Sequence, residues 1–127
     1  MQIKKFDSGA TRDAAPKVDY EGHLSPLALE AYGEYMHEMR KMADGSLRDS
    51  DNWQKGIPLF SYQKSLIRHA FCAWRLWRGW SVQKELIGGV MQKPTLKIAL
   101  CGILFNAMGL LHEIVKEEQG ANHANAA

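Results

Sequence analysis

Apolar side chains recur at helical spacing, every three or four positions, in three long segments of the chain. These segments run from Ser25 to Asp44, from about Leu59 to Arg78, and from about Thr95 to Glu118. Ser25 with Pro26 suits the start of the first helix, Gly79 the end of the second and Pro94 the start of the last. The pattern predicts an all-α fold, a compact bundle of three to four helices.

The remaining segments lack this long-range pattern. Residues 82–92 look like a short additional helix weakened by two adjacent glycines, and no segment alternates over a length that would predict a sheet. Residues 1–24 hold few large apolar side chains and many turn formers, which indicates an irregular, extended arm. We therefore expect an arm at 1–24, a helical domain at 25–118 and a disordered tail at 119–127.

The predicted last helix is apolar nearly all round between Ile98 and Leu111. That run has fourteen residues and includes Asn106, whereas a membrane span needs about 20, so we interpret it as a core helix and not a membrane anchor. In so small a domain, two other helices cannot cover every side of it. The sequence predicts a homo-oligomer that associates through this helix.

A stripe of small and polar residues interrupts the same helix. Gly102, Asn106, Gly109 and Glu113 follow one another at intervals of four, three and four. Small residues allow another backbone or side chain to approach closely, and a buried Asn or Glu needs a hydrogen-bond partner. Two interpretations follow, a tight crossing of two helices and a groove lined for a ligand.

Composition limits the class of protein. The 127 residues, 46% of them hydrophobic, fit one small domain, and a net charge of +2 excludes a polybasic coat or an acidic disordered chain. Cys72 and Cys101 lie in apolar runs without metal-ligand spacing, which favours free thiols in a reducing compartment. We therefore expect a cytoplasmic protein.

Basic residues gather in one part of the chain. Residues 63–97 hold seven Lys or Arg against the single acid Glu85, a local charge of +6. Arg68 and Arg75 share the polar side of the predicted second helix, and guanidinium groups match phosphate oxygens in geometry and charge. Four tryptophans lie near this stretch and suit base stacking, and His69 is a candidate base or phosphate donor. The sequence predicts a nucleotide or another phosphate-bearing small molecule as partner.

The loop from Ser50 to Pro58 is a second candidate for the same ligand. Asn52 can donate to and accept from a base edge, Trp53 offers a stacking face, and Lys55 supplies a charge for phosphate. In the competing interpretation the loop is architectural, and Trp53 closes the core at the end of the bundle.

Carboxylates on the first helix raise the question of a metal. Glu30, Glu34 and Glu38 form one row at intervals of four residues, and oxygen ligands suit Mg²⁺ if the last helix adds Glu113 or Glu117. The predicted metal set is Glu34, Glu38 and Glu113. The alternative is a solvated helix face.

The order of four segments resembles one known family. FDSGATRD, DYEGHLSPLALEAYGEYMHEMR, DGSLRDSDNWQKGIPLFSYQKSLIRHAF and LFNAMGLLHEIVK are similar to small bacteriophage proteins of the dATP/dGTP diphosphohydrolase N-terminal domain type. The resemblance covers Phe6 to Lys116, and DNWQKGIP followed by Arg68 and His69 is its most specific part. The chain has neither the E-E-x-x-E nor the E-x-x-D spacing of MazG-like pyrophosphatases, and no Walker A, G-x-G-x-x-G or H-E-x-x-H motif.

The resemblance implies hydrolysis of purine deoxynucleoside triphosphates in the cytoplasm of a host cell. In the enzyme interpretation, Mg²⁺ held by carboxylates bridges the triphosphate and activates water. A second interpretation keeps the nucleotide site without cleavage, as in a phage protein that sequesters a nucleotide signal of host defence. A helical DNA-binding module is the third, and the low net charge makes DNA the least favoured partner. These three interpretations stay open at the level of sequence.

Overall fold

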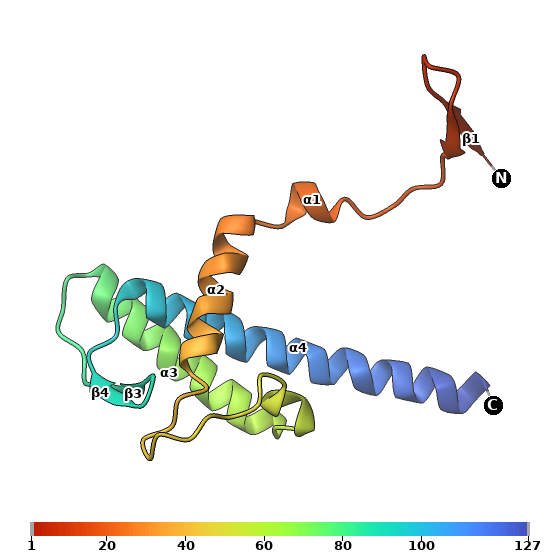
Figure 1. The fold of residues 1–127 in the computed structure, drawn as a ribbon. Helices are drawn as coiled ribbons and strands as arrows, with labels where there is room; N and C mark the ends of the chain where they lie inside the picture. The colour runs from red at the N-terminus through yellow and green to blue at the C-terminus, as the bar shows by residue number, and fades with distance from the viewer. Residues whose placement is uncertain (1, 127) are drawn as a thin grey trace.

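The computed structural model describes the backbone of residues 2–126 and the side chains of residues 2–120. Two long helices form the body of the molecule, α3 (Leu59–Trp77) and α4 (Leu96–Ala126), and they lie side by side (Figure 1). Helix α2 (Pro26–Glu38) packs across α4. The described chain also contains the short helix α1 (Tyr20–His23) and the 3-10 helix η1 (Asn52–Lys55).

Local sequence signals place the helix starts. Ser25 is the N-cap of α2, its Oγ accepts from the Ala28 backbone N–H at 3.1 Å, and Pro26 occupies the first helical position. Helix α3 spans the predicted second helix. Helix α2, in contrast, ends at Glu38, short of the predicted stop at Asp44, because residues 40–48 fold back on themselves through a turn at Gly45 (φ 86°).

The predicted helix at 82–92 is wrong. Strands β3 (Glu85–Ile87) and β4 (Val90–Gln92) form an antiparallel hairpin in which Ile87 pairs with Val90. Gly88 and Gly89 are the two turn residues, with φ of 60° and 80°, and glycine adopts this left-handed backbone without a steric cost. The two glycines that weakened the predicted helix are therefore the signal for the turn.

The N-terminal segment is an arm, but it is not irregular. Strands β1 (Ile3–Lys5) and β2 (Thr11–Asp13) form a second antiparallel hairpin, and α1 follows it. The hairpin projects far from the helical body (Figure 1). The fold is thus mostly helical with two small antiparallel sheets, and the prediction of a purely α-helical protein is wrong on this point.

Helix α4 is longer than predicted. Its backbone is helical through Ala126, past the expected end at Glu118, and Ala127 lies outside the described residues. The disordered tail expected at 119–127 stays a prediction. By length and composition, Leu96–Gly120 could cross a membrane, and 28% of its most apolar window is buried in the body. The expected absence of a membrane partner stays a prediction.

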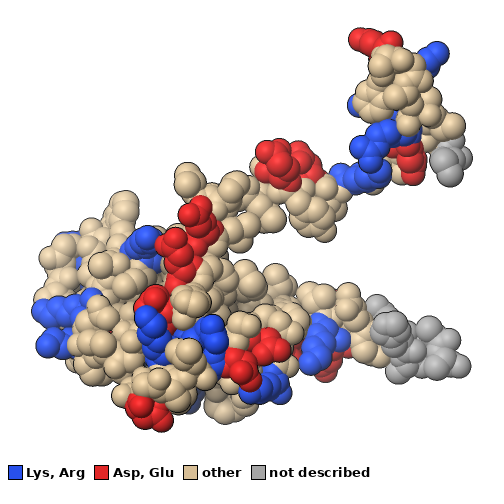
Figure 2. Space-filling view, viewed as in Figure 1, with Lys and Arg blue, Asp and Glu red and all other residues tan. Residues whose placement is uncertain are grey.

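The core is small for a chain of this size. The buried apolar side chains in the described part are Tyr62, Ala73, Ile87, Ala99 and Cys101. The chain exposes 9978 Å², whereas a compact monomer of 14.3 kDa exposes about 6,800 Å². Figure 2 shows why: the arm and the free end of α4 both project from the body. The predicted compactness is therefore wrong for a single chain.

Candidate functional site

The outer side of α3 and the segment that returns from its C-terminal end enclose a groove of about 640 Å³. Its lining includes three basic side chains, Arg68, Arg75 and Lys84. Cys72 and Glu85 also line it. Two residues of the predicted nucleotide site, Arg68 and Arg75, therefore lie in the same groove.

Gly79 makes this groove possible. Its φ of 75° ends α3 in the left-handed region and turns the chain back along the helix. The returning Ser81 carbonyl accepts two hydrogen bonds from Arg75, from Nε at 3.0 Å and from Nη2 at 2.9 Å. Arg75 is thereby held with its guanidinium in a fixed position at the groove.

An apolar hollow of about 230 Å³ adjoins the groove and shares Phe71 and Arg75 with it. The guanidinium of Arg75 lies 5.5 Å from the ring centre of Trp80, and that of Arg78 lies 5.6 Å from the ring centre of Trp74. The side chain of Trp74 is 55% exposed. Aromatic faces and guanidinium groups thus lie next to each other on one surface.

Charge in the groove is only partly neutralised. Arg68 forms an ion pair with Glu85, at 3.1 Å between Nη1 and Oε1. Among the described side chains, neither Arg75 nor Lys84 forms an ion pair. The groove therefore keeps an uncompensated positive charge that suits an anion.

His69 does not line this groove. It lies at the interface between α3 and α4, with its ring packed against Gly102, where an added Cβ would come within 2.7 Å of Nδ1. Nδ1 is buried and has no hydrogen-bond partner among the described residues. Burial, with a smaller contribution from neighbouring Arg68, lowers the pKa of His69. The geometry makes His69 a packing residue of the body.

We predict that the protein loses stability in mild acid because of His69. As the pH falls below about 6.5, the unfolded chain binds a proton at this histidine before the folded chain does, so unfolding becomes more favourable. The melting temperature of the wild type should fall between pH 7.5 and 5.5, and His69→Gln should flatten that fall. The same replacement at His37, an exposed position on α2, is the control. An unchanged pH profile in His69→Gln would contradict the assignment.

The predicted loop residues lie elsewhere. About 24 Å of helix separates the start of α3, where this loop ends, from Arg75. Trp53 packs edge-on against His112 of α4, with ring centres 4.8 Å apart, and Lys55 pairs with Asp49 at 3.4 Å. Asn52 and Trp53 border a separate cavity of about 90 Å³. The structure therefore divides the predicted nucleotide site into three places: the groove, the α3–α4 interface at His69, and the loop.

The contact with His112 leads us to predict that this loop is mainly architectural. Trp53→Ala should lower the melting temperature by several degrees, because it removes the aromatic contact that fastens the loop to α4. Lys55→Ala should leave the melting temperature unchanged, because its ion pair with Asp49 is exposed. Thermal unfolding followed by circular dichroism separates the two, and a stable Trp53→Ala variant with weaker nucleotide binding would reverse the interpretation.

The predicted metal residues do not come together within one chain. Glu38 pairs with Lys41 at 2.9 Å, and this contact holds the pKa of Glu38 below its usual range, while Glu34 is exposed. Glu113 lies near Tyr62, and its Oε1 is buried without a hydrogen-bond partner among the described residues. In the described part of the chain, no three Asp, Glu, His or Cys side chains are grouped closely enough to hold a metal ion. The predicted set of Glu34, Glu38 and Glu113 does not fit Mg²⁺ here, and metal binding stays a prediction.

The polar stripe on α4 forms a tight helix crossing. Gly109 lies against the ring of Tyr62, and Asn106 Nδ2 donates to the Gly102 carbonyl at 2.7 Å. Tyr62 is 1% exposed, with its pKa raised by burial and by Glu113. These contacts confirm the interpretation of Gly102, Asn106 and Gly109 as helix-packing residues.

Sequence reasoning missed the apolar side of the groove. Phe71 is 57% exposed beside the groove, and Trp80 returns to α3 only because of the turn at Gly79. The sequence signal for this arrangement is a glycine that ends a basic helix and is followed directly by a tryptophan, Gly79 and Trp80. Comparisons with protein-family models, with curated proteins and with solved structures find no match. The resemblance to the phage diphosphohydrolase family therefore stays a prediction.

Proposed function

We propose that the protein binds a nucleotide in the groove beside α3. The phosphate lies against Arg68, Arg75 and Lys84, and the base lies in the adjoining hollow between Phe71 and Trp80. The observation that carries this proposal is the position of Arg75, which borders both spaces and is fixed by two hydrogen bonds to Ser81. A guanidinium fixed in this way loses little freedom on binding an anion.

The two spaces suit the two parts of a nucleotide. The larger one holds Arg68, Arg75 and Lys84. The smaller one is bordered by the rings of Phe71, Trp74 and Trp80, on which a base can stack, and by Arg75 and Arg78. The Arg68–Glu85 pair is exposed on its arginine side, so phosphate can share or replace the carboxylate at modest cost. A basic and an aromatic surface next to each other favour a nucleotide over inorganic phosphate alone.

Hydrolysis of purine deoxynucleoside triphosphates, the activity that the resemblance implies, is a second candidate function. In the chain as described, Glu34, Glu38 and Glu113 do not form a metal site beside the groove, and we derive no catalytic step from them. Binding without cleavage, as in a protein that sequesters a nucleotide signal, requires only the groove.

A nucleotide panel tests the proposal. The purified protein is titrated by calorimetry with dATP, dGTP, ADP, cyclic dinucleotides and inorganic phosphate, with and without Mg²⁺, and each mixture is then analysed for products by mass. We expect at least one nucleotide to bind more tightly than phosphate in the absence of Mg²⁺. Product formation would make the protein an enzyme, and equal, weak binding of every compound would overturn the proposal.

A further inference from the structure

We propose that a second copy of this chain docks on the face of α4 that points away from α3, with the two α4 helices antiparallel. The docking face, which we call the outer stripe, consists of five large apolar side chains. They are Leu100, Leu104, Met108, Leu111 and Val115. All five are between 38% and 60% exposed in the single chain.

Helix geometry groups these residues and separates them from the core. At 3.6 residues per turn, the outer stripe falls within an arc of about 80°. Gly102, Asn106 and Gly109, which are buried and face α3, lie on the opposite side of the helix. The residues of the stripe follow one another at intervals of four, four, three and four, and such steps of three and four residues align the side chains of two helices that pack along each other. One side of α4 therefore builds the body, and the other is left uncovered.

The charged residues at the ends of the stripe select the second copy and its direction. Lys97 and Glu118 lie in the same arc as the stripe, both are exposed, and neither forms an ion pair in the described part of the chain. An antiparallel pair centred between Ala107 and Met108 places Lys97 beside Glu118 of the partner subunit at both ends. A parallel pair would place each charge beside its like.

The same register matches the apolar residues. Leu100 meets Val115 of the partner subunit, and Leu104 meets the partner's Leu111. The small side chain of Ala107 lies at the centre, where the two helices approach most closely. A single twofold axis therefore satisfies both the apolar positions and the terminal charges.

The surface area of the chain supports an occupant of substantial size. The single chain exposes about 3,200 Å² more than a compact monomer of its mass, on the arm as well as on α4, and a stable dimer of standard size needs only about 800 Å² from each partner. The free end of α4 extends past the body, so a second body has room beside it (Figure 1).

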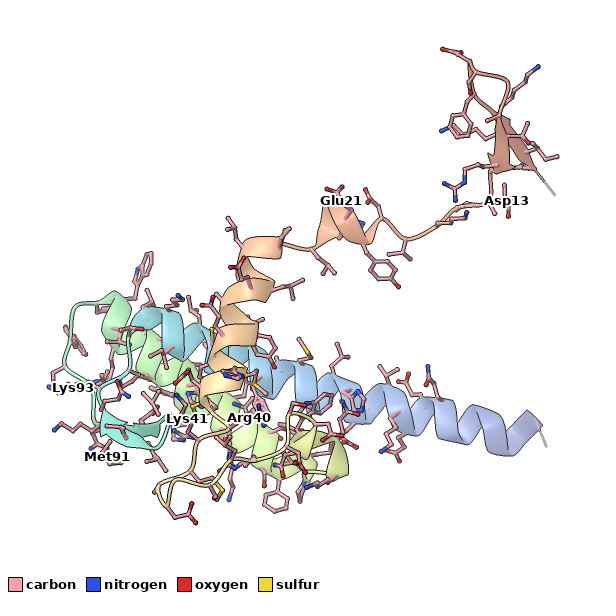
Figure 3. All side chains as sticks on the ribbon, in the orientation of Figure 1. Asp13, Glu21, Arg40, Lys41, Met91 and Lys93 are labelled. Carbon is pink, nitrogen blue, oxygen red and sulfur yellow. The ribbon has the colours of Figure 1, made fainter. Side chains whose placement is uncertain are left out.

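Light scattering on the full-length protein is the first test. We expect a dimer of about 29 kDa at micromolar concentration, twice the mass of the chain. Leu104→Glu places two unpaired charges at the centre of the interface and should weaken dimerisation at least a hundredfold, with the helical circular dichroism signal retained. Met91→Glu is the matched control: Met91 is 58% exposed and lies on the β3–β4 hairpin, away from the free end of α4 (Figure 3). The proposal would be overturned if the wild type were monomeric, or if Leu104→Glu and Met91→Glu weakened dimerisation equally.

Cysteine cross-linking tests the direction, in a Cys72→Ser background that removes the half-buried native thiol. In the antiparallel register, a chain with both Leu104→Cys and Leu111→Cys forms a covalent dimer on mild oxidation. Each single variant oxidised alone does not, because position 104 faces position 111. Efficient cross-linking by either single variant would indicate a parallel pair and overturn the register.

A lipid bilayer is the competing occupant of an apolar helix face. Flotation with vesicles of phosphatidylcholine and phosphatidylglycerol distinguishes it. We expect the wild-type dimer to stay with the soluble fraction. Flotation that is abolished by Leu104→Glu, with no dimer in solution, would assign the outer stripe to a membrane and overturn the proposal.

Discussion

Replacing Gly109 with alanine will lower the free energy of unfolding by about 2 kcal/mol. A Cβ at this position would overlap the ring of Tyr62, the most deeply buried large side chain of the body. Because Tyr62 is held between α3 and α4, it has no room to turn aside, and the two helices must separate. Thermal unfolding should show a fall in melting temperature of about 10 °C.

Gly33→Ala is the matched control, since the same methyl group is added inside α2 with no atom within 4 Å of it. In that variant the free energy of unfolding should rise by about 0.5–1 kcal/mol, because alanine has a higher helix propensity than glycine. A lower free energy of unfolding in Gly109→Ala together with a higher one in Gly33→Ala would establish the close contact between α4 and Tyr62. A Gly109→Ala variant as stable as Gly33→Ala would show that α3 and α4 do not cross at this point.

Replacing Arg75 with alanine will weaken nucleotide binding ten- to a hundredfold. The substitution removes a charged donor that borders both the basic groove and the aromatic hollow, and a hydrogen bond to a charged group contributes about 1.5–3 kcal/mol. Arg75→Lys should recover part of the affinity, because it keeps the charge but loses the planar fork. Calorimetric titration with the nucleotide that binds best measures the loss.

Two further variants show that the loss belongs to the groove. Arg12→Ala makes the same change in net charge on the distant arm and should leave affinity unchanged. Lys84 lines the groove but makes no described hydrogen bond or ion pair. Unlike Arg75→Ala, Lys84→Ala leaves the contact with Ser81 intact, so a loss of affinity in this variant reports on the groove itself. Unchanged affinity in both Arg75→Ala and Lys84→Ala would remove the groove as the binding site.

Sequence predicted those parts of the fold that depend on neighbouring residues. The Ser25–Pro26 start of α2 and the extent of α3 follow from side chains within one helical turn of each boundary. The β3–β4 hairpin escaped prediction because each strand has only three residues, too few for alternation to be visible. For strands this short, the turn pair Gly88–Gly89 is nearly the only sequence feature that indicates a hairpin.

The sequence grouped residues of the candidate groove correctly only where they share one helix. Arg68 and Arg75 are seven positions apart, two full turns, and so lie on the same side of α3. His69 is adjacent in sequence but rotated by about 100°, and this difference turns it toward α4. The position of Trp53 depends on a contact with His112, more than fifty residues later in the chain, and no local pattern predicts such a contact.

The small core also governs how this sequence can diverge. Five apolar side chains are buried in the described chain, while residues such as Leu27, Trp77 and Leu111 are more than half exposed. Substitutions at exposed positions cost the folded monomer little, so selection acts on them only through what the protein binds. A comprehensive mutational scan scored for cellular function should therefore separate two classes: core residues that fail in any assay, and surface residues whose tolerance depends on the presence of a partner. The exposed apolar residues that do not tolerate substitution would then mark the surfaces through which this chain binds its partners.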